Sequence, residues 1–555
     1  MPLGKNVSEG KVPELMTEAQ SGSELKNNKG LVFKLYATIL IFFPIYYILC
    51  RSNNFFEVDG PHRVFDVYNA KEPFLHPNSH LLFPINFLIW NDLLTLVIGP
   101  AGDLIEYCRR SQCLNSVCMG IAVANLFLCS TKITTSIWVP LFISFCFGSA
   151  SAVMLHGTNC SEPVIGFTAS TVAISLLLKK KSPGIIDLVL CMFAGIMLAL
   201  AMANYQTMVF VGPGCLALAL FGWRENKVSI FPNRAILFLM GCVFGTILFF
   251  LVPYWLDGTG GLGACIARFF QNPGEGHVWG GVSIRKVINA YPGFLSNQFL
   301  FPEWSGIREF IRRKPDYGTI IWVAITVAAS VPVIGVVLRK SFRLAKGKTP
   351  EAIQIFGMMV TPLLFLCYWD PTYNKMWLQP LWIFWLIASS GIMKSGKIIR
   401  LTIVSIFLPM IFLNMIWLPL RCQGEIKYLA DANKLLSQIK HGDQIVAEWN
   451  EVVMFAAGID PAREIEFMAN RAITDPGSVQ PRLKEMERSA NKNGTKMFFL
   501  GILDVDQDQW EEFLGNKVGL PFTVLDEYRA RATKVGQIGG KHQVSIFRID
   551  DQKGD

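Results

Sequence analysis

Long apolar runs constrain this chain more than any other feature of its sequence. Eleven stretches of close to 20 residues carry few or no charges, and a helix needs about 20 apolar residues to cross the hydrocarbon core of a bilayer. The sequence therefore predicts an α-helical polytopic membrane protein with about eleven transmembrane helices. The predicted spans are 31–50, 114–130, 135–154, 163–178, 185–203, 206–222, 235–256, 318–338, 351–369, 375–393 and 399–419.

Charged residues divide the chain into two parts. Only 17% of the 555 residues are charged, against about 25% in soluble proteins, so an ordinary cytoplasmic enzyme is excluded. From Leu420 onward 39 of 136 residues are charged, against 54 of the 419 residues before it. We therefore predict a polar cytoplasmic segment 1–30, a transmembrane domain 31–419 and a soluble domain 420–555. Cys422 is the only cysteine of that soluble domain, so no disulfide framework supports it.

The orientation of the chain follows from its loop charges. A twelfth apolar stretch, 81–98, contains Asn86, Asn91 and Asp92. If it does not cross, fifteen Lys and Arg residues lie in the inner loops and none in the short outer loops 155–162, 204–205 and 370–374. If it crosses, all fifteen change side, against the positive-inside tendency. We therefore predict that 81–98 lies on the outer face, with the N-terminus cytoplasmic and the C-terminal domain extracytoplasmic.

Three extracytoplasmic parts follow from this topology, namely the segments 51–113 and 257–317 and the C-terminal domain. In the latter, helical patterns at 425–440, 478–492 and 507–517 alternate with short apolar runs at 444–448, 464–468, 496–503 and 544–549. This alternation predicts a small α/β domain. The first span has no small-residue cleavage site behind it, so it is predicted to be an uncleaved anchor.

Ionisable residues near the outer membrane face are candidates for a site. They are Asp59, His76 and His80 in the first outer segment, and His156 and Glu162 around the loop before the fourth span. Such groups at membrane depth are functional candidates, although a carboxylate at the boundary is often only solvated. The two histidines at 76 and 80 have the spacing of metal ligands, but Pro77 suits the first position of a helix, where His76 is simply a cap.

The outer segment 257–317 combines basic and aromatic residues. Arg268, Arg285 and Lys286 lie in it with Phe269 and Trp279, and such a loop either contacts lipid headgroups or holds a phosphate, for which the arginine fork is suited. The pattern GTGGLG at 258–263 matches a dinucleotide-binding motif only formally, because a membrane helix and not a strand precedes it. Nucleic acid is not an expected partner of charge outside the cell membrane.

These features together resemble the GT-C superfamily of polytopic glycosyltransferases, which includes protein O-mannosyltransferases and the aminoarabinose transferase that modifies lipid A. The resemblance rests on Asp59 followed by the stretch 76–83 (HPNSHLLF), on Glu162 in the next outer loop, and on 369–377 (WDPTYNKMW) before a late span. In the mannosyltransferases two acids are adjacent after the first span. Here Asp59 and Asp66 are seven residues apart, so the choice between them as base stays open.

The resemblance implies a glycosyltransferase, hexosyl or pentosyl, that moves a sugar from a polyprenyl-phosphate donor to an acceptor hydroxyl at the outer face of the plasma or inner membrane. The acceptor is a protein, a lipid or a glycan of the cell envelope. It implies Asp59 as general base and Glu162 as a second catalytic acid that orients the acceptor or a metal. Substrate-binding candidates are His76, His80, His156, Arg268, Arg285, Lys286 and Lys375. No cofactor is implied except, as an open alternative, a divalent metal. A transporter or lipid flippase with an accessory domain is the competing interpretation.

Overall fold

The computed structural model describes most of the membrane domain and most of the C-terminal domain. The described residues are 29–53, 61–68, 82–178, 184–222, 230–251, 281, 283–299, 317–347, 350–371, 373–421, 426, 428–447, 450–460, 463, 465–468, 476–504, 507, 522–538 and 544–550.

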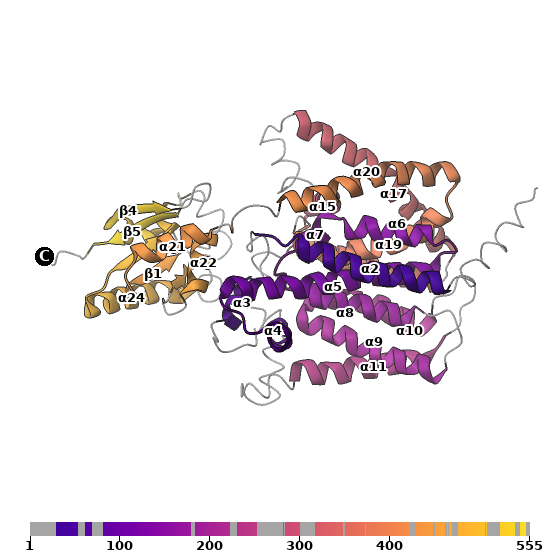
Figure 1. Ribbon diagram of the computed structural model, residues 1–555, viewed down its shortest axis with the longest axis horizontal. Helices are drawn as coiled ribbons and strands as arrows, with labels where there is room; N and C mark the ends of the chain where they lie inside the picture. The colour runs from indigo at the N-terminus through magenta and orange to yellow at the C-terminus, as the bar shows by residue number, and fades with distance from the viewer. Residues whose placement is uncertain are drawn as a thin grey trace, which may run out of the picture.

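All eleven predicted spans are helical, and they lie side by side in one bundle (Figure 1). Seven helices of the described residues are long and apolar enough to cross a membrane, or eight if the bent pair α6–α7 is one span. The spans correspond to α2 (Lys29–Leu49), α5 (Leu104–Ile133), α6 (Trp138–Gly148) with α7 (Ser151–Gly157), α8 (Pro163–Leu177), α9 (Ile185–Asn204), η2 (Gln206–Val211) with α10 (Gly212–Phe221), α11 (Pro232–Thr246) with η3 (Ile247–Leu251), α17 (Tyr317–Gly347), α18 (Pro350–Tyr368), η4 (Asn374–Trp377) with α19 (Leu378–Met393), and α20 (Lys397–Arg421).

Glycines bring α9 and α11 into close contact. A Cβ atom on Gly195 would lie 2.1 Å from the Phe238 carbonyl oxygen, and one on Gly241 would lie 2.0 Å from that of Met192. Gly241 and Gly245 form a GxxxG pair, the spacing that lets membrane helices approach backbone to backbone. Lipid is as apolar as the side chains, so this shape fit contributes to holding the two helices together.

Replacing Gly241 with Leu is therefore expected to disrupt the bundle. The new side chain would meet backbone atoms that cannot turn away, and overpacking of this kind costs typically 1–3 kcal/mol or more. Size-exclusion chromatography in detergent should show loss of the monodisperse peak. Gly335→Leu is the matched control, because a Cβ at Gly335 of α17 meets nothing within 4 Å; equal behaviour of both variants would contradict the packing account.

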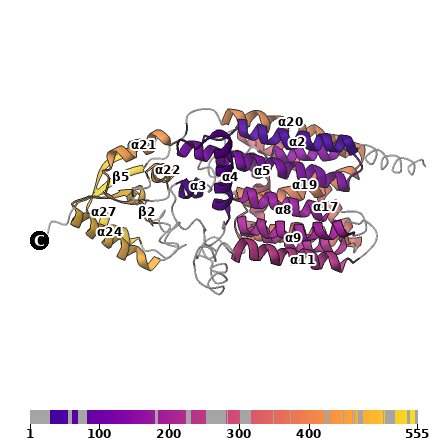
Figure 2. The same ribbon diagram turned by 60° about the horizontal axis from the view of Figure 1, so that its bottom comes forward.

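The helix α4 (Phe83–Ile98) runs across the direction of the bundle helices, at the end nearest the C-terminal domain (Figure 2). Phe83, Phe87 and Asn91 face inward and are buried, whereas Leu96 and Val97 are 84% and 80% exposed. An apolar face left exposed on a crosswise helix is typical of a segment that lies in a membrane interface. This direction agrees with the expectation that 81–98 does not cross the membrane.

Arg110 of α5 fixes α4 in this position. Its guanidinium is buried and donates hydrogen bonds to Asn91 Oδ1 (3.2 Å), Thr95 Oγ1 (2.9 Å) and the Gly99 carbonyl oxygen (2.7 Å). Glu106 supplies the counter-charge at 2.9 Å. On the predicted topology Arg109 and Arg110 lie on the outer side, against the positive-inside tendency. In the structure Arg110 is buried and holds α4 against α5.

The C-terminal domain is a five-stranded mixed sheet with helices on both faces, as the alternating pattern predicts. The strand order is β2–β1–β3–β5–β4, with β2, β1 and β3 parallel and β5 antiparallel to both β3 and β4. The elements are α21 (Leu429–Gln438), β1 (Gln444–Ala447), α22 (Glu451–Ile459), β2 (Ile465–Phe467), η5 (Pro476–Ser478), α24 (Val479–Asn493), β3 (Met497–Leu500), η6 (Ile502–Asp504), α27 (Thr523–Arg529), β4 (Ala532–Ile538) and β5 (Val544–Ile549).

Alternate residues of the strands face the two helical layers. Ile445 and Ala447 pack with α21 and α22, whereas Val446 packs with α24 and α27. The elements α22, β4 and α27 were not expected from the sequence; β4 carries mostly exposed residues at the sheet edge and lacks an apolar run. Most of the predicted helix 507–517 lies outside the described residues.

The C-terminal domain contacts the membrane domain through α3 (Pro61–Tyr68). Phe65 of α3 packs against Phe455 of α22 with ring centroids 5.9 Å apart. A Cβ on Gly458 would lie 2.6 Å from the Phe65 ring. Buried residues of α3, α4 and α5 form one hydrophobic cluster with those of α21, α22 and the sheet, so the domain is docked on α3, α4 and the start of α5.

Gly458→Leu should loosen this docking because the leucine occupies the space that the Phe65 ring fills. The expected result is faster limited proteolysis between residues 421 and 429, with the isolated sheet domain remaining folded. Phe65→Ala makes room for the leucine, so the double variant should regain much of the protection. Protease resistance that is unchanged in Gly458→Leu would show that this contact does not hold the domain.

Candidate functional site

The N-terminal part of α5 organises the end of the bundle nearest the C-terminal domain. The helix begins at Leu104, ten residues before the predicted span, because Asp103 caps it by accepting a hydrogen bond from the Glu106 amide (2.8 Å). Its first turns carry polar side chains that the bundle buries, namely Arg110, Ser111, Gln112, Asn115 and Ser116. Buried polar groups are costly without partners, and most of these hold neighbouring segments in place.

Two of these side chains fix the α7–α8 loop (residues 158–162). Ser116 Oγ donates to the carbonyl oxygen of Gly157 at 2.8 Å. Asn115 Nδ2 donates to the carbonyl oxygens of Asn159 (2.8 Å) and Ser161 (2.9 Å). The backbone of the loop is therefore held by α5 on both sides of Cys160.

The predicted site residues His156 and Glu162 flank this fixed loop. His156 lies in the last turn of α7, and its Nδ1 is 2.5 Å from Ser161 Oγ. Glu162 immediately precedes Pro163, the first residue of α8. Their exposed fractions are 1% and 3%. A carboxylate at the start of a helix is favoured by the helix dipole, so the loop presents an acid and an imidazole in a preorganised, water-poor setting.

The chain leaving α2 is tied to the same loop. The amide of Ser52 donates to the Thr158 carbonyl oxygen (3.1 Å), and the Ser52 carbonyl oxygen accepts from Arg109 Nη1 (2.8 Å) and Gln112 Nε2 (2.9 Å). Asn53 Oδ1 also accepts from Arg109. The outer segment that carries Asp59 therefore starts beside the loop that carries Glu162.

Tyr205, at the end of α9, lies between Lys375 and the start of α8. A Cβ on Gly166 would lie 3.2 Å from Tyr205 Cβ, so α8 and the end of α9 are in direct contact. The Lys375 ammonium lies over the rings of Tyr205 and Tyr373, at 5.7 and 4.7 Å from their centroids. These cation–π contacts hold the ammonium beside the two rings.

Of the three basic residues predicted to hold a phosphate, Arg268, Arg285 and Lys286, the structure describes the last two. Lys286 of α15 (Ile284–Gln298) donates to the carbonyl oxygens of Tyr368 (2.9 Å) and Trp369 (2.5 Å) at the end of α18. Its charge thereby stabilises the C-terminus of that helix. Arg285 is exposed, and Arg268 lies outside the described residues. The structure therefore joins Lys286 to α18 and does not bring it together with Arg285.

Three further predicted residues, Asp59, His76 and His80, lie outside the described residues, and so does the GTGGLG motif. Asp66 falls within α3, but nothing is described of its side chain. In the described part of the chain, no three His, Cys, Asp or Glu side chains group closely enough to hold a metal ion. The predicted divalent-metal site at His76 and His80 lies outside the described residues, so it stays a prediction.

The sequence interpretation missed Gln112, Asn115 and Ser116. Their signal was available, since Ser111 and Asn115, and likewise Gln112 and Ser116, are four residues apart and therefore share a helix face. Gln112 precedes the predicted span 114–130 and falls in the predicted outer segment, whereas Asn115 and Ser116 fall at the start of that span. Recognising that α5 starts at Leu104 would have placed them on a helix that continues into the membrane.

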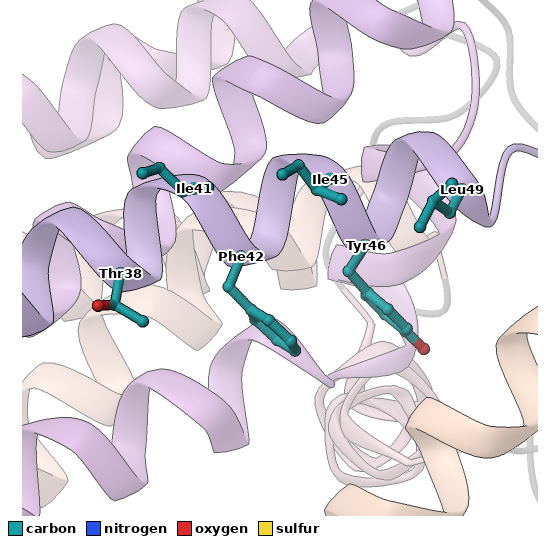
Figure 3. Close-up of a pocket in the computed structure, with 6 residues that line it drawn as sticks. All are labelled: Thr38, Ile41, Phe42, Ile45, Tyr46 and Leu49. Carbon is teal, nitrogen blue, oxygen red and sulfur yellow. The ribbon is translucent and has the colours of Figure 1, made fainter.

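An apolar groove runs along α2 towards this end of the bundle (Figure 3). It is an open groove of about 490 Å³, lined by Thr38, Ile41, Phe42, Ile45, Tyr46 and Leu49. The Tyr46 hydroxyl donates to the Met415 carbonyl oxygen of α20 at 2.5 Å, and Phe42 contacts Phe145 of α6 with centroids 5.8 Å apart. The groove thus lies on α2 beside α6 and α20, and its last residue, Leu49, is three residues from the Ser52 anchor.

Comparison with solved structures identifies the architecture. ArnT from Cupriavidus metallidurans bound to undecaprenyl phosphate has a TM-score of 0.57 and 7% identity, covering 94% of this chain and 98% of that one. The apo state of the same protein has a TM-score of 0.55, 8% identity and the same coverage. Archaeal oligosaccharyltransferase AglB from Archaeoglobus fulgidus, in complex with an inhibitory peptide and a dolichol-phosphate, has a TM-score of 0.50 and 11% identity, covering 93% of this chain and 76% of that one.

No family model and no curated protein sequence matches the chain. The structural likeness nevertheless confirms the GT-C-like membrane fold expected from the motifs, with a small α/β domain at the C-terminus. Together with the apolar helices, this fold makes the chain an integral, multi-pass membrane protein.

Proposed function

We propose that this protein is a glycosyltransferase that moves a sugar from a polyprenyl-phosphate donor to an acceptor hydroxyl at the outer membrane face. The observation that carries the proposal is the burial of His156 and Glu162 at the two ends of a loop fixed by α5, within a GT-C-like fold. Transfer of a sugar to a hydroxyl requires a carboxylate to take the hydroxyl proton, and preorganised cations to stabilise the phosphate that leaves.

In this proposal Asp59 is the general base, and Glu162 orients the acceptor or a metal. His156, hydrogen-bonded to Ser161, adds an orienting group beside Glu162. Lys375 is the described cation best suited to the donor phosphate, because it lies near the start of α8. Arg268 and Arg285 remain candidates from the outer segment. Lys286, already bonded to the end of α18, contributes by holding that helix end.

The α2 groove fits the lipid part of such a donor. It is lined almost wholly by apolar side chains and follows α2 from Thr38 to Leu49, a rise of about 16 Å at 1.5 Å per residue. A polyprenyl chain lying there would bring its phosphate to the level of Ser52 and the α7–α8 loop. All the residues that line this groove belong to α2, and none belongs to the crosswise helix α4.

Full-length protein in proteoliposomes with a radiolabelled polyprenyl-phosphate sugar tests the proposal. Transfer of label to an added membrane-extract acceptor is expected, and Glu162→Gln should reduce it by about tenfold or more. Glu485→Gln, an exposed change in the C-terminal domain, should leave it unchanged. Movement of intact labelled lipid between leaflets, with no transfer, would instead support the transporter or flippase interpretation.

A further inference from the structure

Two cysteines far apart in sequence meet beside the candidate site. Cys108 lies on α5 and Cys160 lies in the α7–α8 loop. The Cys160 thiol donates a hydrogen bond to the Cys108 carbonyl oxygen at 3.3 Å. Both side chains are fully buried. The fold therefore brings the two cysteines into direct contact across 52 residues of sequence.

The pair lies beyond the hydrocarbon core of the membrane. With 30 residues, α5 is about 45 Å long at 1.5 Å per residue, whereas the core is about 30 Å thick. Cys108 is in the second turn of this helix. Cys108 and Cys160 also belong to the hydrophobic cluster that α3, α4 and α5 form with the C-terminal domain. On the predicted topology this end faces an extracytoplasmic compartment, where disulfides form and persist.

We propose that Cys108 and Cys160 form a disulfide that fastens the α7–α8 loop to α5. The two thiols lose two protons and two electrons as the S–S bond forms, and a disulfide-bearing oxidant is reduced to two thiols. Because both sulfur atoms are buried in the folded protein, oxidation takes place before the loop packs or during its local opening. Once formed, the bond is shielded from reductants.

The position of the bond gives it a consequence for the site. It would join the helix that carries Asn115 to the loop that carries Glu162, adding a covalent tie to the hydrogen bonds at Gly157, Asn159 and Ser161. A disulfide between residues 52 positions apart stabilises a protein mainly by restricting its unfolded chain. This inference does not depend on the proposed reaction, since it concerns the covalent state of the chain.

The experiment uses the full-length protein in native membranes. Free thiols are blocked with N-ethylmaleimide under denaturing conditions without reductant, and the peptides are then examined by mass spectrometry. Most molecules are expected to yield a Cys108–Cys160 linked peptide. Cys113 is the internal control, because it lies five residues further along α5 and points about 140° away around the helix. Blocking of both thiols in full, or a cross-link through Cys113, would overturn the proposal.

Thermal unfolding in detergent gives a second, independent readout. Cys108→Ser and Cys160→Ser should each lower the apparent Tm by about 5 °C or more. The double variant should lose no more than either single variant, because the first change already removes the bond. Cys113→Ser should leave the Tm unchanged. Additive losses in the double variant would show two separate packing contributions and no disulfide.

Discussion

Asp59→Asn should reduce turnover by roughly 10²–10⁴-fold with little change in stability. Asparagine keeps the shape of the side chain but cannot accept the proton that the acceptor hydroxyl loses. The described residues before Asp59 are anchored at Ser52 to the loop that holds Glu162, which supports this choice of base. Steady-state assays with the labelled donor measure the effect, and the loss should appear in kcat more than in KM.

Asp66→Asn is the matched control for this prediction. On the spacing of the family motif Asp66 is the wrong acid, and it belongs to α3, whose Phe65 packs on the C-terminal domain. Its Asn variant should therefore retain activity. An inactive Asp66→Asn beside an active Asp59→Asn would reverse the assignment of the base. Full activity of both variants and of Glu162→Gln would end the transferase proposal.

Arg234→Met is expected to produce the largest loss of stability, about 3–5 kcal/mol. Arg234 and Asp187 form an ion pair of 3.1 Å in which each side chain is 1% exposed. Arg234 also donates to the Leu177 carbonyl oxygen (3.1 Å), so it joins α8, α9 and α11. Methionine fills a similar volume but removes the guanidinium charge that faces the buried Asp187 carboxylate.

A double variant separates charge burial from packing. Removing both charges, as in Arg234→Met with Asp187→Leu, leaves no ion to desolvate, and such replacements are often neutral or stabilising. The double variant should therefore recover much of the apparent Tm that Arg234→Met loses in detergent. Lys397→Met is the control, since Lys397 is exposed at the start of α20. A double variant as unstable as the single one would place the effect in packing and the bond to Leu177.

The helices of this protein were predictable because each reflects a local rule. A run of about 20 apolar residues has few alternatives to crossing a bilayer, and every predicted span is helical. The polar Asn86, Asn91 and Asp92 within 81–98 distinguished α4 from the spans, and the structure shows it crosswise to the bundle. The edge strand β4 was missed because its residues are mostly exposed, so its sequence lacks the apolar pattern of a strand. It forms by pairing with β5, a partner that its own residues do not indicate.

The candidate site was predictable as residue types and not as an arrangement. The sequence by itself determined that these acids and histidines lie in or beside the segments between apolar spans, since charge and hydropathy fix which segments meet water. Only the tertiary structure decided that Asn115 holds Asn159 and Ser161, 44 and 46 residues away, and that Ser52 meets Thr158. Such partners are chosen by helix packing, because a buried polar group must find its hydrogen bond wherever the neighbouring helices bring one within about 3 Å.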